Sequence, residues 1–469
     1  MAVNTLPLWC KTKKMSMTVT IAKVVEILVS SIQSEGEIMG HLLDGNLYEA
    51  ELCARNMAHE VFNGVMERLL QTGAERVNAE FCEEYQRRGF KSMELRPLDI
   101  ELHTGHRVKV RGMYAKRVDT EANGSRHLLV RHWSVNANCS PLRTSQVAMC
   151  AGLSPSYDVG NELIKGFGPV QSTSRVRKIT QEFADWTSGR EVALVLGKGE
   201  TLEGKRVALS IDGGRTRTRE YKKSKEELGG VGQRSCPFDA PWREPKVFVI
   251  QVLDEKGEVE RKELPIYGTR FAEDDVLALL LEYLKALHIE RAAGVQIVAD
   301  GAPWIWNNLK RLLLEVGVCE SKIVETLDYP HASGYLSKII EQMPKRSLRA
   351  GKDKLLTQFK ELLWQGDALK IVEKCRAIFK RPSQECQRWI NYLEKHSEKT
   401  QYAHFKANKW LCGSGIIESG IRRVVNLRFK NPGTFWYKDN VEKLFLIRSV
   451  CLAKRWATFM DNYVNLEHS

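Results

Sequence analysis

The spacing of apolar residues predicts two helical regions in the first part of the chain. The stretch VFNGVMERLLQ repeats apolar residues at helical spacing, which predicts a mostly helical region over 1–95. Helical spacing returns over 141–200, where two helices flank a break at Gly166–Pro169 and a run of Ser and Thr would cap the second helix. That second helix carries three basic side chains, Arg175, Arg177 and Lys178. It fits the recognition helix of a helix-turn-helix in a DNA major groove, and equally a helical linker with a solvated basic face.

Between these helices the pattern changes to an alternation of apolar with polar or basic residues. Two stretches, 107–118 and 127–135, alternate in this way on either side of Asn123-Gly124. Alternation with a period of two is typical of half-buried strands, and Asn-Gly is a strong turn signal. The sequence therefore predicts a small β region over 96–140.

From residue 205 onward, apolar runs that predict strands alternate with helical patterns. Five runs are predicted to be strands: 207–212, 246–254, 261–268, 295–300 and 322–331. Helices are predicted over 274–287 and over 303–317, where Pro303 would occupy the first turn. Residues 337–406 show helical spacing and no strand pattern. The pattern therefore favours an α/β region followed by a helical segment.

Charge adds a partner class to this picture. The 469 residues include 71 Lys and Arg against 58 Asp and Glu, a formal charge of +13. Such a surplus favours a polyanionic partner, with nucleic acid first and an anionic membrane second, although a merely basic protein would show it too. No apolar run approaches the ~20 residues of a membrane span. The most apolar early segment, 18–32, is interrupted by Lys23 and Glu26. It therefore reads as an amphipathic helix, and we expect a cytoplasmic protein.

Cysteine usage argues against a disulfide framework and a zinc ribbon. The eleven cysteines are scattered, and no two of them show C-x-x-C spacing. We expect reduced thiols, mostly buried as small hydrophobes, and no zinc.

Two of the predicted strands end in Asp-Gly and supply candidate chemistry. Asp212 closes the first strand and Asp300 closes the fourth. In open α/β sheets ligands bind outside such strand ends, so the two carboxylates would converge if the strands are neighbours. At about 4 Å they would repel by roughly 1 kcal/mol in water and roughly 4 kcal/mol at an intermediate dielectric. Such a pair requires protons or a cation, and Mg²⁺ prefers carboxylate oxygens. Each Asp-Gly alone also fits a simple turn.

A third carboxylate stands at the head of a basic stretch. The sequence GSGIIESGIRRVVNLRFKNPGTFW contains one acid, Glu418, and four strong bases: Arg422, Arg423, Arg428 and Lys430. Glu418 could complete a metal site with the two aspartates, while the bases hold DNA phosphates. The spacing of Glu418 and Arg422 also fits an ordinary helix salt bridge of ~0.3 kcal/mol.

Four pieces of the sequence resemble bacterial insertion-sequence transposases of the DDE class: SIDGGRTRTRE, VADGAPWIWNNL, ETLDYPHASGYL and GSGIIESGIRRVVNLRFKNPGTFW. The resemblance covers roughly residues 200–456. It implies a ribonuclease-H-like core, a mixed five-stranded sheet flanked by helices, with Asp212, Asp300 and Glu418 as the triad. It also implies Mg²⁺ or Mn²⁺, two ions, held by that triad. The expected partners are double-stranded DNA, both transposon ends and target, and at least a second copy of the chain.

The chain between Asp300 and Glu418 is much longer than a compact core needs. By resemblance to Mutator-like and hAT-like transposases, a helical insertion domain over 337–406 would split the core into 201–336 and 407–469. Those families also carry an acid or cysteine three residues before a histidine, matched here by Asp-Tyr-Pro-His ending at His331. The resemblance implies that His331 lies near the scissile phosphate; a histidine satisfied by backbone at a strand end is the alternative. Related proteins often have an upstream cysteine pair that looks like a zinc ribbon, but only Cys139 is nearby here.

Basic and aromatic residues surround the two aspartates. Three arginines alternate just past Asp212, namely Arg215, Arg217 and Arg219. In an extended segment they would share one side and track DNA phosphates, although a solvated loop would also fit. Trp304 follows Asp300, and Trp436 closes the last motif. Either ring could stack on an unpaired base for ~1–3 kcal/mol, or lie in the core.

These observations predict a DNA transposase with a helical N-terminal DNA-binding region. Water would attack at the transposon end, and the freed 3′-hydroxyl would then attack target DNA, with metal ions activating the nucleophile and stabilising the leaving oxygen. No covalent protein–DNA intermediate is needed. A ribonuclease-H-like nuclease without strand transfer shares the same metal site. A catalytically inactive, sequence-specific DNA-binding protein on the same fold is the other alternative.

Overall fold

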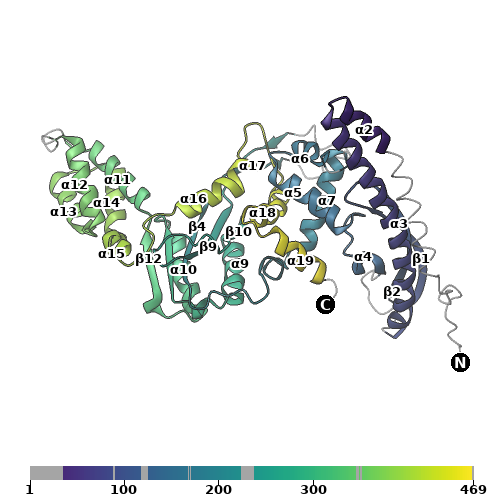
Figure 1. The fold of residues 1–469 in the computed structure, drawn as a ribbon. Coiled ribbons are helices and arrows are strands. Elements are labelled where there is room, and N and C mark those ends of the chain that lie inside the picture. The colour runs from purple at the N-terminus through teal and green to yellow at the C-terminus, as the bar shows by residue number, and fades with distance from the viewer. Residues whose placement is uncertain are drawn as a thin grey trace. The chain divides into compact units, whose positions relative to one another are not determined.

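The computed structural model describes residues 35–466, with gaps at 88–89, 118–124, 167, 169–170, 223–236, 345–347 and 349–350. The chain divides into two compact units, one made of Met1–Trp186 with Met460–Ser469 and the other of Thr187–Phe459. Figure 1 labels the elements of both. The predicted amphipathic helix at 18–32 and the predicted turn at Asn123-Gly124 lie outside the described residues. No described helix is both long enough and apolar enough to cross a membrane.

A long helix and a three-stranded sheet open the first unit. The short helix α2 (Glu35–Leu43) precedes α3 (Leu47–Arg87), and α3 packs on the antiparallel sheet, whose order is β1-β2-β3. The strands are β1 Phe90–Glu101, β2 Arg107–Arg117 and β3 Ser125–His127. Asn78 of α3 fastens the helix to β2, since its amide accepts from Met113 N (2.9 Å) and donates to Arg111 O (2.8 Å).

The predicted strand over 127–135 is wrong for most of its length. Only the end of β3 reaches His127, and α4 (Leu128–His132) follows at once. Leu128 and Leu129 are adjacent and both buried. Adjacent residues of a strand point to opposite faces, so a strand with one solvated face cannot bury both, whereas a helical turn can.

Within 141–190 the described residues form three helices, where two were predicted. They are α5 Pro141–Leu153, α6 Tyr157–Ile164 and α7 Thr173–Thr187. Serines cap their beginnings as the sequence predicted for α7, where the Ser172 hydroxyl accepts from Arg175 N at 3.2 Å. The helices share a buried apolar cluster that includes Val147, Ile164 and Ile179. At the end of the chain, Tyr463 of α19 (Trp456–Leu466) packs edge-on against Phe183 of α7.

The second unit is built on a mixed five-stranded sheet in the order β10-β9-β4-β11-β12. Its strands are β4 Arg206–Gly213, β9 Lys246–Leu253, β10 Ile266–Arg270, β11 Gly294–Ala299 and β12 Ile323–Leu327. β4, β11 and β12 run parallel, while β9 is antiparallel to both of its neighbours. All five predicted strands are confirmed, although β10 starts later than predicted and β12 stops before the predicted end. The sheet and its helices are compatible with a ribonuclease-H-like core.

Helices cover both faces of this sheet. On β10, a Cβ atom at Gly268 would collide with Phe248 and crowd Leu279 of α9, so this position faces α9. The preceding residue, Tyr267, lies against Gly420 of α16. Since neighbouring residues of a strand face opposite ways, α9 and α16 cover opposite faces, as Figure 1 also shows. The flanking helices are α9 Glu273–Ala286, α10 Pro303–Glu315, α16 Gly415–Ile421, α17 Leu427–Phe429 and α18 Lys438–Leu452.

Between β12 and α16 the described chain is helical, as predicted for 337–406. The helices are α11 Tyr329–Glu341, α12 Lys352–Trp364, α13 Ala368–Ile378, α14 Gln384–Lys395 and α15 Tyr402–Ala407. They share one apolar core that includes Phe359, Ile371 and Leu393. The first of these helices starts directly after β12 and is therefore anchored to the sheet.

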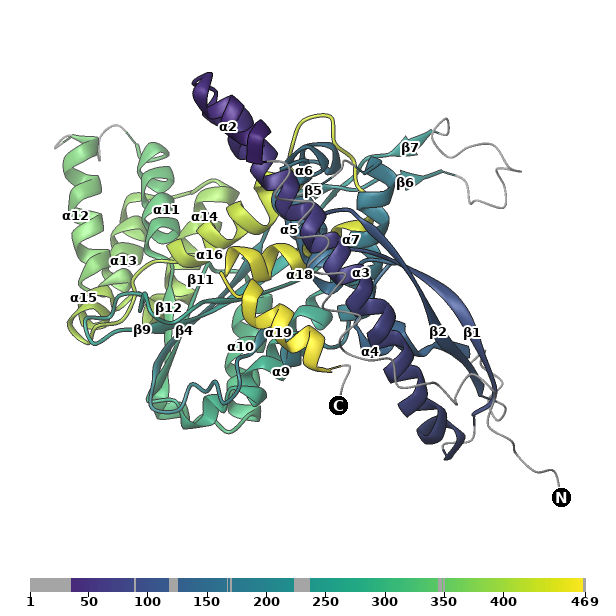
Figure 2. The ribbon, with the colours of Figure 1, turned by 45° about the vertical axis from the view of Figure 1, so that its right-hand side comes forward.

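A narrow two-stranded arm leaves the end of β4 and returns to β9. Its strands are β5 Thr216–Arg217, β6 Glu220–Tyr221, β7 Phe238–Asp239 and β8 Trp242–Arg243. β5 pairs with β8, and β6 pairs with β7, as Figure 2 shows. We call residues 215–222 and 237–244 the basic arm.

Candidate active site

Asp212 and Asp300 lie at the same edge of the sheet, on neighbouring parallel strands. Ile297 of β11 pairs with Leu209 of β4, so Asp300 and Asp212, each three residues further on, are level with one another. Both are half-buried. The condition set for convergence, that the two strands are neighbours, is therefore met, and the two carboxylates share one environment.

The environment of Asp212 disfavours its charged form. Burial raises the pKa of Asp212 to about 6, and the charges of Asp300 and Glu244 push it in the same direction. A hydrogen bond from Gly213 N to Asp212 Oδ1 (2.6 Å) only partly opposes this effect. The site therefore carries more negative charge than it can stabilise alone.

Asp328 and His331 form a tight pair at the end of the next strand. Asp328 follows β12, is fully buried and caps α11. Its Oδ2 accepts from His331 N (2.9 Å) and from His331 Nδ1 (2.6 Å). The hydrogen bond that His331 donates to Asp328 raises the pKa of the imidazole, and the charges of Asp300 and Asp212 raise it further. The imidazole thus lies in the field of both predicted aspartates. Because Nδ1 is committed to Asp328, Nε2 is the nitrogen left for a ligand.

Glu418 joins this group from α16, which packs on β4 and β9. Its carboxylate oxygen, an oxygen of Asp328 and a ring nitrogen of His331 lie within 4.8 Å of one another. Among the described residues these three side chains form the one such group of possible metal ligands. Asp328 Oδ1 also accepts from Ser414 N (2.6 Å), at the start of α16. One buried carboxylate therefore positions both the histidine and the helix that carries Glu418.

The four residues predicted to be catalytic are thus neighbours. Glu418 belongs to one group of possible metal ligands with Asp328 and His331, and the two aspartates act on that histidine through their charges. That Asp212, Asp300 and Glu418 hold metal ions together stays a prediction. The sequence motif contained Asp328 as the acid before His331 but gave it no role. A signal for its capping role was present, because an acid directly before a helix with proline in its first turn is a typical N-cap.

The basic arm carries the three alternating arginines as predicted. Arg215 and Arg217 are exposed, whereas Thr216 and Thr218 between them are buried. The Arg217 guanidinium lies 4.9 Å from the ring centre of Trp242. That tryptophan is itself 49% exposed.

Arg219 is more enclosed, and the last motif lies beside it. Its guanidinium lies 4.2 Å from the ring centre of Phe238. Trp436 N donates to Arg217 O (3.0 Å), and Arg219 N donates to Trp436 O (2.8 Å). The basic arm and the segment that ends in Trp436 were predicted separately to bind DNA, and these hydrogen bonds place them side by side.

The basic residues around Glu418 fall into two classes. Arg422 and Lys430 are exposed. Arg423 is half-buried and donates to Tyr267 Oη at 2.7 Å. Arg428 is fully buried, with its guanidinium 5.2 Å from the ring centre of Trp436. The prediction that Arg428 contacts DNA is therefore wrong, because no part of its side chain reaches the surface.

Trp304 lies in the first turn of α10, after Asp300, and is half-buried. The Lys246 amine lies 4.9 Å from its ring centre. In the first unit, Arg177 and Lys178 are exposed on α7. Arg175 instead donates to Ala137 O and holds the helix to the preceding loop. Two of the three predicted basic residues of α7 thus face solvent.

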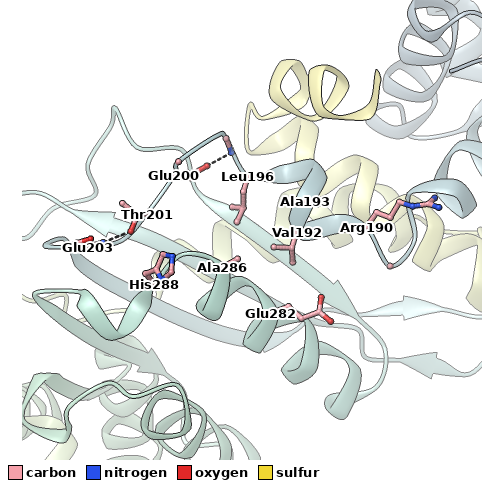
Figure 3. Close-up of a pocket in the computed structure, with 13 residues that line it drawn as sticks. Arg190, Val192, Ala193, Leu196, Glu200, Thr201, Glu203, Glu282, Ala286 and His288 are labelled. Atoms are coloured by element: carbon pink, nitrogen blue, oxygen red, sulfur yellow. Dashed lines mark hydrogen bonds between the residues drawn. The ribbon is translucent and has the colours of Figure 1, made fainter. Parts of the chain in front are cut away.

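A cavity of about 730 Å³ lies elsewhere in the second unit, between α8 (Glu191–Val195) and α9. Figure 3 shows its lining, in which Val192, Leu196 and Ala286 supply apolar surface. None of the predicted catalytic residues lines it. The Glu200 carboxylate at its rim is held by the Arg455 guanidinium through two hydrogen bonds, at 2.8 and 2.9 Å. This acid therefore has a structural partner.

Comparison with known proteins gives one distant likeness. No family model matches the chain, and no curated protein matches its sequence. Among solved structures, the Drosophila P element transposase strand transfer complex is similar at 13% sequence identity, over 69% of this chain and 81% of that chain, with a TM-score of 0.25. A likeness this weak decides neither fold nor function, which rest on the residues described above.

Proposed function

We propose that this chain is a DNA transposase that cleaves and joins DNA strands by metal-dependent phosphoryl transfer. The observation that carries the proposal is the convergence of Asp212, Asp300, Glu418 and the Asp328–His331 pair at one end of the sheet. Four carboxylates and one imidazole in one place suit chemistry on a phosphodiester, whose charge must be neutralised during the reaction.

The donor set fits a hard divalent cation. Carboxylate oxygens are the preferred ligands of Mg²⁺ and also suit Mn²⁺. The raised pKa of Asp212 indicates that this group needs a positive partner to remain ionised at neutral pH. Asp212, Asp300 and Glu418 would hold two such ions. When bound there, Mg²⁺ would activate the attacking oxygen and stabilise the leaving one.

His331 would work beside these carboxylates. Its raised pKa keeps the imidazole protonated further toward neutral pH than a free histidine. With Nδ1 held by Asp328, the proton at Nε2 is available to a phosphate oxygen or to the leaving oxygen. Asp328 is fully buried, and its role is to position the histidine.

Exposed cations of the second unit would hold the DNA around this centre, namely Arg215, Arg217, Arg422 and Lys430. The first unit would bind DNA separately through Arg177 and Lys178 of α7. Contacts of this kind fix the position of the duplex without reading its sequence. Recognition of two transposon ends and a target also calls for at least two copies of the chain.

The test is cleavage of DNA tiled from the sequence flanking the coding segment, in Mg²⁺, by wild type and by Glu418→Gln. We expect cleavage by the wild type only, with equal duplex binding by both proteins. Equal cleavage by both would remove Glu418 from the site. Joining of the cleaved 3′ end to a second duplex distinguishes a transposase from a simple nuclease. Tight binding without cleavage by either protein would favour an inactive DNA-binding protein.

A further inference from the structure

A second hollow begins at His331 and runs along α11, away from the carboxylates. It has a volume of about 240 Å³ and is lined by Pro330, His331, Gly334, Tyr335 and Lys338. Their spacing puts all five on one face of the helix. The hollow therefore has room for several water molecules or for one small anionic group.

Lys338 supplies a cation to the hollow, and two aromatic rings lie beside its amine. The Lys338 amine lies 5.1 Å from the ring centre of Tyr335 and 5.8 Å from that of Trp389. Within the part of the chain that the structure describes, no carboxylate oxygen lies within ion-pair distance of this amine. A lysine held by rings keeps its full charge for an incoming anion.

Gly334 keeps the hollow open. It lies in the middle of α11, where glycine is less favourable than alanine. A Cβ atom added there would meet no atom within 4 Å, so packing does not require the glycine. The residue instead leaves free space between His331 and Lys338, in which a ligand can approach the backbone.

The hollow adjoins the candidate active site, because His331 belongs to both. Its other wall is connected to the site by packing, since Tyr335 lies edge-on against Tyr392, with ring centres 4.6 Å apart. Tyr392 in turn lies next to Gly301, directly after Asp300. Lys338 lies seven positions after His331, a rise of roughly 10 Å along the helix. An anion at Lys338 is thus a group other than the phosphate at the metal site.

We propose that this hollow binds a phosphodiester of the DNA strand that neighbours the phosphodiester being cut, with Lys338 as its counter-ion. The inference rests on the proposed function. Lys338 contributes to the placement of the strand in the carboxylate site and takes no part in the bond changes. His331 serves both phosphates from the shared end of the hollow.

Duplex binding tests the cation directly. The probe is a fluorescein-labelled 30-bp duplex, measured by anisotropy in Ca²⁺ over a range of salt concentrations. Lys338→Gln should weaken binding about threefold to tenfold and lower the salt slope by about one. Lys374→Gln is the matched control, because Lys374 is exposed on α13 of the same helical segment. Equal binding by both variants would overturn the proposal.

Substitution of Gly334 tests the space separately from the charge. Gly334→Leu introduces a helix-favouring residue, so the helix itself should not be destabilised. Its side chain fills the hollow, and it should weaken binding as much as Lys338→Gln. Wild-type binding by Gly334→Leu would show that nothing enters the hollow.

A methylphosphonate scan on a duplex that the wild type cleaves identifies the phosphate. One uncharged linkage near the cut should weaken duplex binding by the wild type by the same factor as the substitution Lys338→Gln does. In the Lys338→Gln variant the same linkage should cause no further loss of binding. If the wild type cleaves and no linkage behaves in this way, the proposed function survives and the hollow loses its role. If the wild type does not cleave but Lys338→Gln still weakens binding, the transposase proposal fails and the phosphodiester site stands.

Discussion

The acids at the strand ends and the arginines of the basic arm, both in the second unit, differ in how far they are buried. The acids at the strand ends are half or fully buried, and Asp328 has no exposed surface at all. In the basic arm Arg215 and Arg217 are exposed, and the Arg217 guanidinium lies over the ring of Trp242. Burial makes the first region costly in free energy, whereas water still solvates the second.

This difference separates what each region can do. Buried carboxylates repel one another, and a bound cation or proton reduces this repulsion. Substitution of these residues should therefore change both the stability of the protein and its catalytic activity. Exposed cations cost little to keep, and their loss affects mainly the binding of a polyanion. Substitutions in the two regions should therefore have effects of different kinds and sizes.

The largest expected effect comes from Asp212→Asn. Cleavage should fall at least about a hundredfold, because a neutral amide cannot hold the cation. The same variant should be more stable at pH 8. Asp212 has a pKa of about 6 when folded against 3.8 as a reference, so its ionisation costs the folded state up to about 3 kcal/mol above pH 6. Urea unfolding at pH 8 and at pH 4 measures this gain.

The gain should shrink toward zero at pH 4, where folded Asp212 is protonated. Mg²⁺ supplies a second control, because it should raise the Tm of the wild type and have much less effect on Asp212→Asn. A variant that is destabilised at pH 8, or equally stabilised at both pH values, would show that ionisation of Asp212 does not destabilise the folded state.

Asp328→Asn should have the next largest effect, this time on stability in the opposite direction. An amide NH₂ in place of Oδ2 would face two donors, His331 N and Nδ1, inside the protein. A loss of about 2–4 kcal/mol in the free energy of unfolding is expected. Denaturant unfolding across pH 3–9 measures it.

The pH profile of that loss follows from the two pKa shifts. Burial raises the pKa of Asp328, but hydrogen bonds from His331 and Ser414 outweigh it and lower the pKa below its reference of 3.8. The carboxylate's contribution is therefore present above pH 3.8 and is lost as the pH falls through the lowered value. The pKa of His331 is raised above 6.5, so its contribution is present below pH 6.5 and is lost as the pH rises through the raised value. The loss should thus be largest between about pH 4 and 6.5, and a flat profile would contradict the pairing.

The sheet of the second unit could be predicted because its strands are buried on both faces and read as continuous apolar runs. The start of β1 could not be predicted in this way. Pro97 lies within that strand and looks like a breaker, but β1 lies at the edge of its sheet, next to β2, where proline is tolerated. Sequence patterns therefore located the strands that position the candidate site better than those of the first unit.

The candidate site itself was predictable in part. The strand-end aspartates carried their own signal in Asp-Gly, whereas the grouping of Glu418 with Asp328 depends on how α11 and α16 pack. Arg428 was misjudged for a different reason. A π-helical turn over Arg422–Asn426 precedes it and shifts the helical phase, so that a charged residue is turned into the core.

The smallest expected effect comes from Arg217→Gln in the basic arm. Removal of one exposed phosphate contact should weaken duplex binding severalfold and reduce the salt slope by about one. The free energy of unfolding should change by less than about 0.5 kcal/mol, since the side chain is exposed. Arg381→Gln, a change of the same chemistry at an exposed position in the helical segment, is the control. If both variants bind DNA equally well, the arm's cations do not differ from ordinary surface charge. A large loss of stability in Arg217→Gln would instead show that the Trp242 contact is structural, and would remove the contrast between the arm and the buried acids.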